Sequence, residues 1–171
     1  MLETTRTYVA KIANHQQVRG DLDACGFAAS KLWNVGRYYI QGRWDDDGEI
    51  PDERELKSEL KDHERYSDLH SQSSQRVLEE LSEAFTGWDN SDNGNNPPGY
   101  RKRGDRHPRS TVTWKQKGIK HDDKHGQIRL SKGWNLKDGR SDFILVKYET
   151  RPEVTVENIQ QARAVWNGDR W

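Results

Sequence analysis

The sequence predicts an α+β fold in which a mainly helical first part is followed by a small antiparallel sheet or barrel. Before residue 90, apolar side chains recur every three or four residues, which is the period of an amphipathic helix. After residue 110, short apolar segments alternate with turn residues, which is typical of antiparallel strands. Seven tryptophans and six tyrosines argue against a disordered chain, although 33% of the residues are charged.

The first elements follow from these patterns. Residues 5–13 alternate between polar and apolar side chains and predict a strand. Residues 18–40 place their apolar side chains on one helical face, and Asn34, Arg37 and Tyr38 lie off that face. Cys25 lies on the apolar face, so we expect a buried thiol rather than a nucleophile. Residues 44–51 predict a turn.

Two further helices complete the first part. Asp52 is a suitable N-cap for a second helix that reaches about Arg65 and packs through Leu56 and Leu60. A third helix is expected to begin at Asp68 or Ser71, because residues 77–88 carry a regular apolar stripe. Its first turns contain Gln72 and Gln75, beside backbone N–H groups that can bind an anion.

The second part begins with loops. Residues 89–99 are rich in Asn, Gly and Pro and predict a mobile linker. Residues 97–109 are too rich in Pro and Gly for a helix and too charged to be buried, so we expect a surface loop. Strands are predicted over 110–115, 127–130 and 142–148, and from 154 or 159 to 166, with a turn at 121–125.

Charge is unevenly distributed, although the formal net charge is zero. Residues 43–65 carry ten acids and five bases, whereas residues 99–140 carry thirteen bases and four acids. A basic loop beside Tyr100 and Trp114 suits a polyanion with stackable bases, and the alternative is a solvated connecting loop.

These patterns define a set of candidate nucleic-acid-binding residues. The expected phosphate contacts are Arg101, Lys102, Arg103, Arg106, Arg109, Lys115 and Lys117. The side chains suited to base edges are Asn34, Arg37, Tyr38, Gln72 and Gln75, with a plain solvated face as the alternative. Tyr100 and Trp114 are candidates for base stacking, with a place in the core as the alternative.

Several motifs, in order, resemble the N-terminal part of TnpB, the OrfB-type transposase. TnpB is a transposon-encoded, RNA-guided DNA nuclease related to type V CRISPR effectors. The motifs are Leu32-Trp33-Asn34, Ser71-Gln72-x-x-Gln75, Pro98-Gly-Tyr-Arg-Lys-Arg, Ile128-Arg-Leu-Ser-Lys-Gly-Trp and Asn167-Gly-Asp-Arg-Trp171. In the fourth motif, Ser131 stands where the family has a proline.

The resemblance implies a wedge-type β-barrel interrupted by a helical recognition insertion of about three helices. Residues 1–14 would be the first barrel strand, 15–96 the insertion and the linker, and 97–171 the basic loop and the remaining strands. The implied partners are guide RNA from the transposon end and target DNA, in transposition and DNA recombination. The family's nuclease half and zinc ribbon follow later in sequence, so neither cleavage, metal nor cofactor is expected here.

The resemblance also leaves alternatives. The Asn167-Gly168 turn is followed by three residues only, which suggests a truncated chain with an incomplete last hairpin. Such a chain could be one half of a split nuclease that needs a separately encoded catalytic half, or an inert transposon remnant. No apolar run reaches membrane-spanning length and the N-terminus lacks a signal-peptide core, so the sequence predicts a cytoplasmic protein without a membrane partner.

Overall fold

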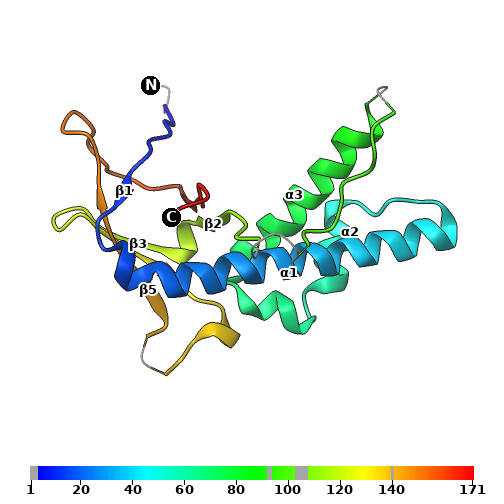
Figure 1. Cartoon of the computed structure of the whole chain (residues 1–171), viewed down its shortest axis with the longest axis horizontal. Helices are drawn as coiled ribbons and strands as arrows, with labels where there is room; N and C mark the ends of the chain where they lie inside the picture. The colour runs from blue at the N-terminus through cyan, green and yellow to red at the C-terminus, as the bar shows by residue number, and fades with distance from the viewer. Residues whose placement is uncertain (1–3, 92–93, 103–107, 140) are drawn as a thin grey trace.

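The structure is a computed structural model that describes residues 4–91, 94–102, 108–139 and 141–171. It confirms the α+β prediction. Three helices, α1 (His15–Asp47), α2 (Glu53–Leu60) and α3 (Ser71–Asp89), precede most of the strands. Figure 1 shows α1 running along the length of the molecule, with the sheet at its N-terminal end and α2 and α3 along its other half.

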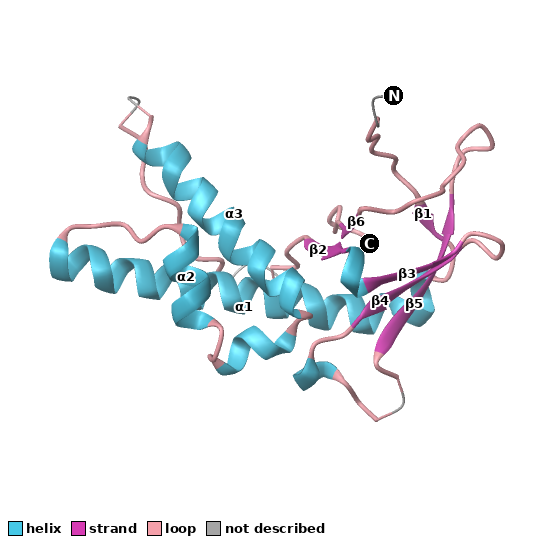
Figure 2. Ribbon diagram, turned by 180° about the vertical axis from the view of Figure 1, so that it is seen from behind, coloured by secondary structure: helices cyan, strands magenta, loops and turns pink. Residues whose placement is uncertain are grey.

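The strands form two antiparallel sheets. One has the order β1-β5-β4-β3, and the other pairs β2 with β6 (Figure 2). Their bounds are β1 (Lys11–Ile12), β2 (Val112–Lys115), β3 (Ile119–Asp122), β4 (Gln127–Ser131), β5 (Phe143–Glu149) and β6 (Gln161–Ala164). The antiparallel prediction is therefore correct, but within the described residues the strands do not close into a barrel.

The first strand is much shorter than the alternation over 5–13 predicts. Only Lys11 and Ile12 pair, opposite Glu149 and Tyr148 of β5, and Val9 is 95% exposed. The partner strand ends in a turn closed by a hydrogen bond from Val154 N to Arg151 O. Pro152 in that turn has no N–H to donate. The residues before Lys11 therefore find no continuing strand with which to form backbone hydrogen bonds.

Helix α1 is longer than predicted, because the expected turn over 44–51 begins only after Asp47. Gly48 ends the helix in the left-handed conformation at φ 75°, and its N–H bonds Trp44 O at 2.9 Å. Side-chain pairs four residues apart support the last turn: Gln41 donates to Asp45 at 2.8 Å, and Arg43 Nε lies 3.1 Å from Asp47 Oδ2.

The predictions for the next two helices are confirmed in part. Asp52 caps α2 by accepting a bond from Glu55 N at 2.8 Å, but α2 ends at Leu60 rather than near Arg65. A separate 3₁₀ helix, η1 (Glu64–Asp68), covers the remainder. Helix α3 begins at Ser71, one of the two predicted starts, and is capped by His70.

The turn predicted at residues 121–125 is wrong in its first half, since His121 and Asp122 belong to β3. This strand alternates half-buried Ile119 and His121 with exposed Lys120 and Asp122, as a strand with one covered face does. The tight turn to β4 ends at Gly126, which has φ 61°. The other predicted strands are present with shifted ends.

The core lies where α1, α3 and the two sheets meet. Its largest fully buried side chains include Leu22, Leu32, Leu78, Phe85 and Trp114. Cys25 is buried as predicted, and burial raises the pKa of its thiol to about 12, which leaves it unreactive.

None of the described helices combines the length and the apolar composition that crossing a membrane would require.

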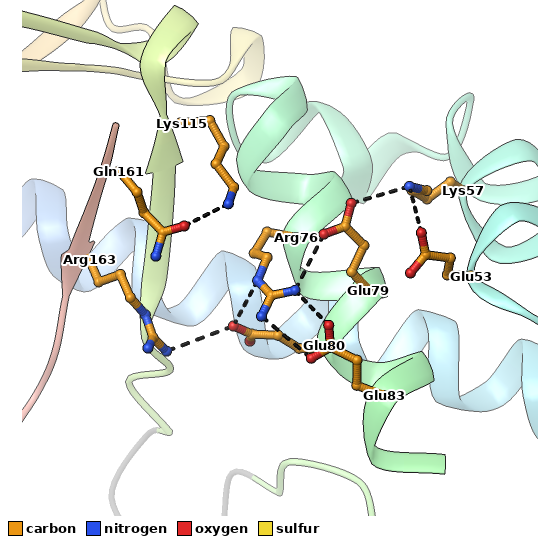
Figure 3. A network of polar contacts seen from close by, with 9 residues as sticks. All are labelled: Glu53, Lys57, Arg76, Glu79, Glu80, Glu83, Lys115, Gln161 and Arg163. Carbon is orange, nitrogen blue, oxygen red and sulfur yellow. Dashed lines mark hydrogen bonds and ion pairs between the residues drawn. The ribbon is translucent and has the colours of Figure 1, made fainter. Parts of the chain in front are cut away.

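A network of ion pairs covers the outer face of α3 (Figure 3). Arg76 lies within ion-pair distance of three carboxylates on its own helix, those of Glu79, Glu80 and Glu83. Two cations from other elements contact these carboxylates: Lys57 of α2 lies 3.2 Å from Glu79, and Arg163 of β6 lies 3.8 Å from Glu80. The acidic side chains of α3 are therefore largely neutralised from within the fold.

Two histidines make the stability of this fold dependent on pH. His15 Nε2 accepts a bond from Trp171 N at 3.0 Å, and His70 Nδ1 accepts one from Gln72 N at 3.3 Å. Burial lowers the pKa of both below the ordinary 6.5, with help from Arg170 at His15 and Lys137 at His70. The unfolded chain therefore takes up protons first as the pH falls, and the stabilisation present above pH 6.5 is lost on acidification.

We accordingly expect the melting temperature to be flat from about pH 8 to 7 and to fall between about pH 6.5 and 5.5. Thermal melts at constant ionic strength measure this directly. The double variant His15→Gln, His70→Asn should show a flatter profile over that interval, because amides accept hydrogen bonds without titrating. An identical fall in wild type and variant would contradict this assignment.

Candidate nucleic-acid interface

The first residues of the basic loop are fixed along one face of α1 by side-chain hydrogen bonds to their backbone. Arg37 Nε donates to Pro98 O at 2.7 Å, and Trp33 Nε1 donates to Gly99 O at 3.0 Å. The Asn34 side chain makes two hydrogen bonds with the backbone of Arg101. Asn34 Nδ2 donates to Arg101 O at 2.8 Å, and Arg101 N donates to Asn34 Oδ1 at 2.7 Å. The Asn34 amide thus satisfies the backbone N–H and C=O of Arg101, as a residue of a paired strand would.

The far end of the loop returns to the same helix, nearer its N-terminus. Ser30 Oγ donates to Pro108 O at 2.7 Å and lies 2.6 Å from Ser110 Oγ. Ser110 N donates to Gly26 O at 3.3 Å. The contact positions on α1 recur every three or four residues, so one helical face holds both ends of the loop.

Arg101 is held partly inside the fold rather than in solvent. Its guanidinium carbon lies 3.9 Å from the centroid of the Trp33 ring, and Nη1 donates to Ser110 Oγ at 2.8 Å. Burial lowers the pKa of Arg101, while the Glu80 carboxylate raises it. An arginine retains its charge under such shifts, so the side chain brings a fixed positive charge to this face.

The prediction that the whole basic run faces solvent is wrong for Arg109. Its side chain is only 17% exposed, and Nε lies 2.6 Å from Asp23 Oδ1. The same carboxylate accepts a bond from Trp171 Nε1 at 2.9 Å. Partial burial raises the pKa of Asp23, but the bonds from Arg109 and Trp171 outweigh it and lower the pKa. Arg109 is therefore neutralised by an ion pair.

A groove of about 530 Å³ lies where this loop, α1 and η1 meet, and we call it the basic groove. Four cationic side chains line it, and none of the described residues that line it is acidic. Its lining residues are Lys31, Asn34, Val35, Tyr38, Arg65, Tyr100, Arg101 and Lys102. Such a charge pattern favours a polyanionic ligand.

Two tyrosines form the aromatic part of the basic groove. The rings of Tyr38 and Tyr100 are 4.6 Å apart between centroids and are tilted by 46°. The guanidinium of Arg37 lies 4.9 Å from the Tyr100 centroid and supports that ring from beside α1. Tyr38 is 69% exposed, so its ring offers the open surface on which a planar group can stack.

The cations of the basic groove differ in how they are held. Arg65 Nη1 lies 3.4 Å from Asp68 Oδ2, which orients the guanidinium. Within the described part of the chain, neither Lys31 nor Lys102 forms an ion pair. These two lysines therefore leave their charge available to an external anion.

The structure brings five of the predicted site residues together in the basic groove. They are Asn34, Tyr38, Tyr100, Arg101 and Lys102. Arg37 is buried, with 5% of its surface exposed, and lies behind the groove, which corrects the prediction that it lies on an open face. Asn34 uses its amide edge on Arg101, so we assign it a positioning role instead of base contact.

The remaining predicted residues lie elsewhere. Trp114 is 1% exposed and donates to Ser131 O, so its predicted alternative as a core residue is correct and stacking is not available to it. Lys115 donates to Gln161 beside α3, as Figure 3 shows, and Lys117 is exposed on the 3₁₀ helix η2 (Gln116–Gly118). Outside the basic groove lie Gln72, Gln75, Arg109, Trp114, Lys115 and Lys117, whereas Arg103 and Arg106 lie outside the described residues.

Sequence reasoning missed three lining residues, Lys31, Val35 and Arg65. Lys31 and Val35 had a signal, since they lie seven and three positions before Tyr38 and therefore share its helical face. Arg65 had none, because only the packing of η1 against α1 brings it to the groove.

No three His, Cys, Asp or Glu side chains within residues 4–91, 94–102, 108–139 and 141–171 are grouped so that they could hold a metal ion. Comparison with protein-family models finds none that matches this chain, and comparison with curated proteins finds no match either.

Proposed function

We propose that the chain is a nucleic-acid-binding protein and that it binds single-stranded RNA in the basic groove. One observation carries the proposal: four cations and an exposed tyrosine line the groove, and no acid is among the described residues that line it. Cations neutralise phosphates, and aromatic rings stack on unpaired bases of any sequence. The combination suits a single strand better than a duplex, whose bases are already stacked.

A finer proposal follows from the resemblance to TnpB. We propose that the RNA is a guide RNA bound together with target-adjacent DNA, without cleavage by this chain. We propose further that residues 15–96 are a recognition insertion in a wedge-type barrel. The sheet order supports this, because β1 precedes the helices and yet pairs with β5, which follows them.

Fluorescence anisotropy with a labelled oligouridylate tests the binding proposal. If all four cations of the basic groove contact phosphate, the plot of log affinity against log salt should have a slope of about −3. An abasic oligonucleotide of equal length keeps the phosphates and lacks the bases, so it should bind more weakly. Binding that is independent of salt, or equal for both ligands, would refute a groove that contacts both phosphates and bases.

A further inference from the structure

We propose that Trp134 is a second stacking residue and that it extends the basic groove, so that one RNA strand runs from Tyr38 past Arg65 to Trp134. This inference rests on the proposed function, because it concerns the path of the same strand. It goes further by assigning a contact to a segment of the chain that lies outside the groove.

The first observation is exposure. Trp134 is 77% exposed, whereas the other six tryptophans, all in the described part of the chain, are buried or half-buried. Its indole N–H makes no hydrogen bond to any described residue. Tryptophan is among the residue types that contribute most to binding surfaces, and this ring is open to a ligand.

The second observation is that the turn carrying this ring is held rigidly. Trp134 opens the 3₁₀ helix η3 (Trp134–Leu136), and Asn135 Nδ2 donates to Glu64 O and to Asp68 Oδ1, both at 2.9 Å. On the other side, the buried Lys132 ammonium lies 3.2 Å from Asp21 Oδ1 of α1. A ring on a fixed turn loses little entropy on binding, which favours a role in recognition.

The third observation connects this turn to the basic groove. The buried carboxylate of Asp68 accepts a bond from Asn135 through Oδ1, and its Oδ2 holds Arg65 at 3.4 Å. One carboxylate therefore positions both a cation of the groove and the residue next to Trp134. In Figures 1 and 2, η1 and η3 lie together on the same side of α1.

The fourth observation is charge. The Lys137 ammonium lies 5.5 Å from the centroid of the Trp134 ring. A cation beside an exposed ring repeats the chemistry of the basic groove, which Lys31, Lys102 and Tyr38 line together. A nucleotide that stacks on Trp134 would place its phosphate within reach of such a cation, which a purely apolar partner would not need.

The test uses oligouridylates of about 4 to 16 nucleotides with wild type and two variants, Trp134→Ala and Trp134→Phe. With the shortest strand, which fills only the basic groove, all three proteins should bind equally. With the longest strand, Trp134→Ala should bind about 5- to 150-fold more weakly than wild type, and Trp134→Phe should retain most of the affinity. The length dependence separates a stacking contact from a general loss of stability.

A spectroscopic readout covers the case in which Trp134→Ala folds poorly. Long oligouridylate should quench the fluorescence of wild type more than that of Trp134→Phe, because the exposed indole is the one covered. If wild type binds RNA and both variants match it at every length, the inference is wrong and the proposed function stands. If wild type binds no RNA, the proposed function fails and the inference fails with it.

Discussion

Replacing Lys31, Tyr38 and Lys102 together by alanine should weaken RNA binding by about 100-fold or more. Loss of one stacked base costs about 1–3 kcal/mol, and each lost phosphate contact adds to this at moderate salt. The slope of log affinity against log salt should also become shallower by about 1.4 units, since two contacts are removed. These side chains make no hydrogen bond or ion pair to the described residues, so the variant should fold like wild type.

A matched control replaces the same residue types outside the basic groove. Lys120 of β3, Lys124 of the following turn, and Tyr8 in the N-terminal segment are all exposed. The triple alanine variant at these positions has the same composition and charge as the groove variant. Its affinity should stay close to that of wild type. If both variants lose affinity equally, the effect comes from net charge and the groove is not the site.

Replacing Gly133 by alanine should destabilise the protein by about 3 kcal/mol. A Cβ at this position would lie 2.4 Å from the carbonyl of Asp68 and from the backbone nitrogen of Leu69. Backbone atoms cannot rotate away as a side chain can, so η1 and η3 must separate. For a protein of this size, the melting temperature should fall by roughly 6–12 °C, measured by circular dichroism.

Gly20 provides a control of opposite sign. It lies within α1, and a Cβ there would meet nothing within 4 Å. Alanine has the higher helix propensity, so Gly20→Ala should stabilise the protein by about 0.5–1 kcal/mol. A Gly133→Ala variant that melts within about 1 °C of wild type would show that the contact between η1 and η3 tolerates an extra methyl group.

The helices were predictable from sequence because their signals are local. The apolar stripes of α1 and α3, the buried Cys25 and the Asp52 cap all depend on residues within a few turns of one another. The strand β1 was overestimated because an alternating pattern carries no information about where the partner strand ends. Its length was decided by the turn at Pro152, far along the chain.

The candidate site was predictable where its signals are local, either in a consecutive run or, as for Asn34 and Tyr38, off the apolar face of one helix. Tyr100, Arg101 and Lys102 form one run, and the structure places them in one groove. The ion pair that neutralises Arg109 could not be predicted, because Asp23 is separated from it by 86 positions. Likewise, Arg65 reaches the groove only through the packing of η1 against α1.

The pairing of β1 with β5 has a consequence for how the protein assembles. Lys11 must pair with Glu149, which closes a loop of roughly 140 residues. The contacts that hold the basic loop on α1 span shorter separations, between 61 and 86 positions. During synthesis, the segment from α1 to Ser110 is made before β5, so the contacts that hold the basic loop on α1 can form while β1 is still without its partner strand.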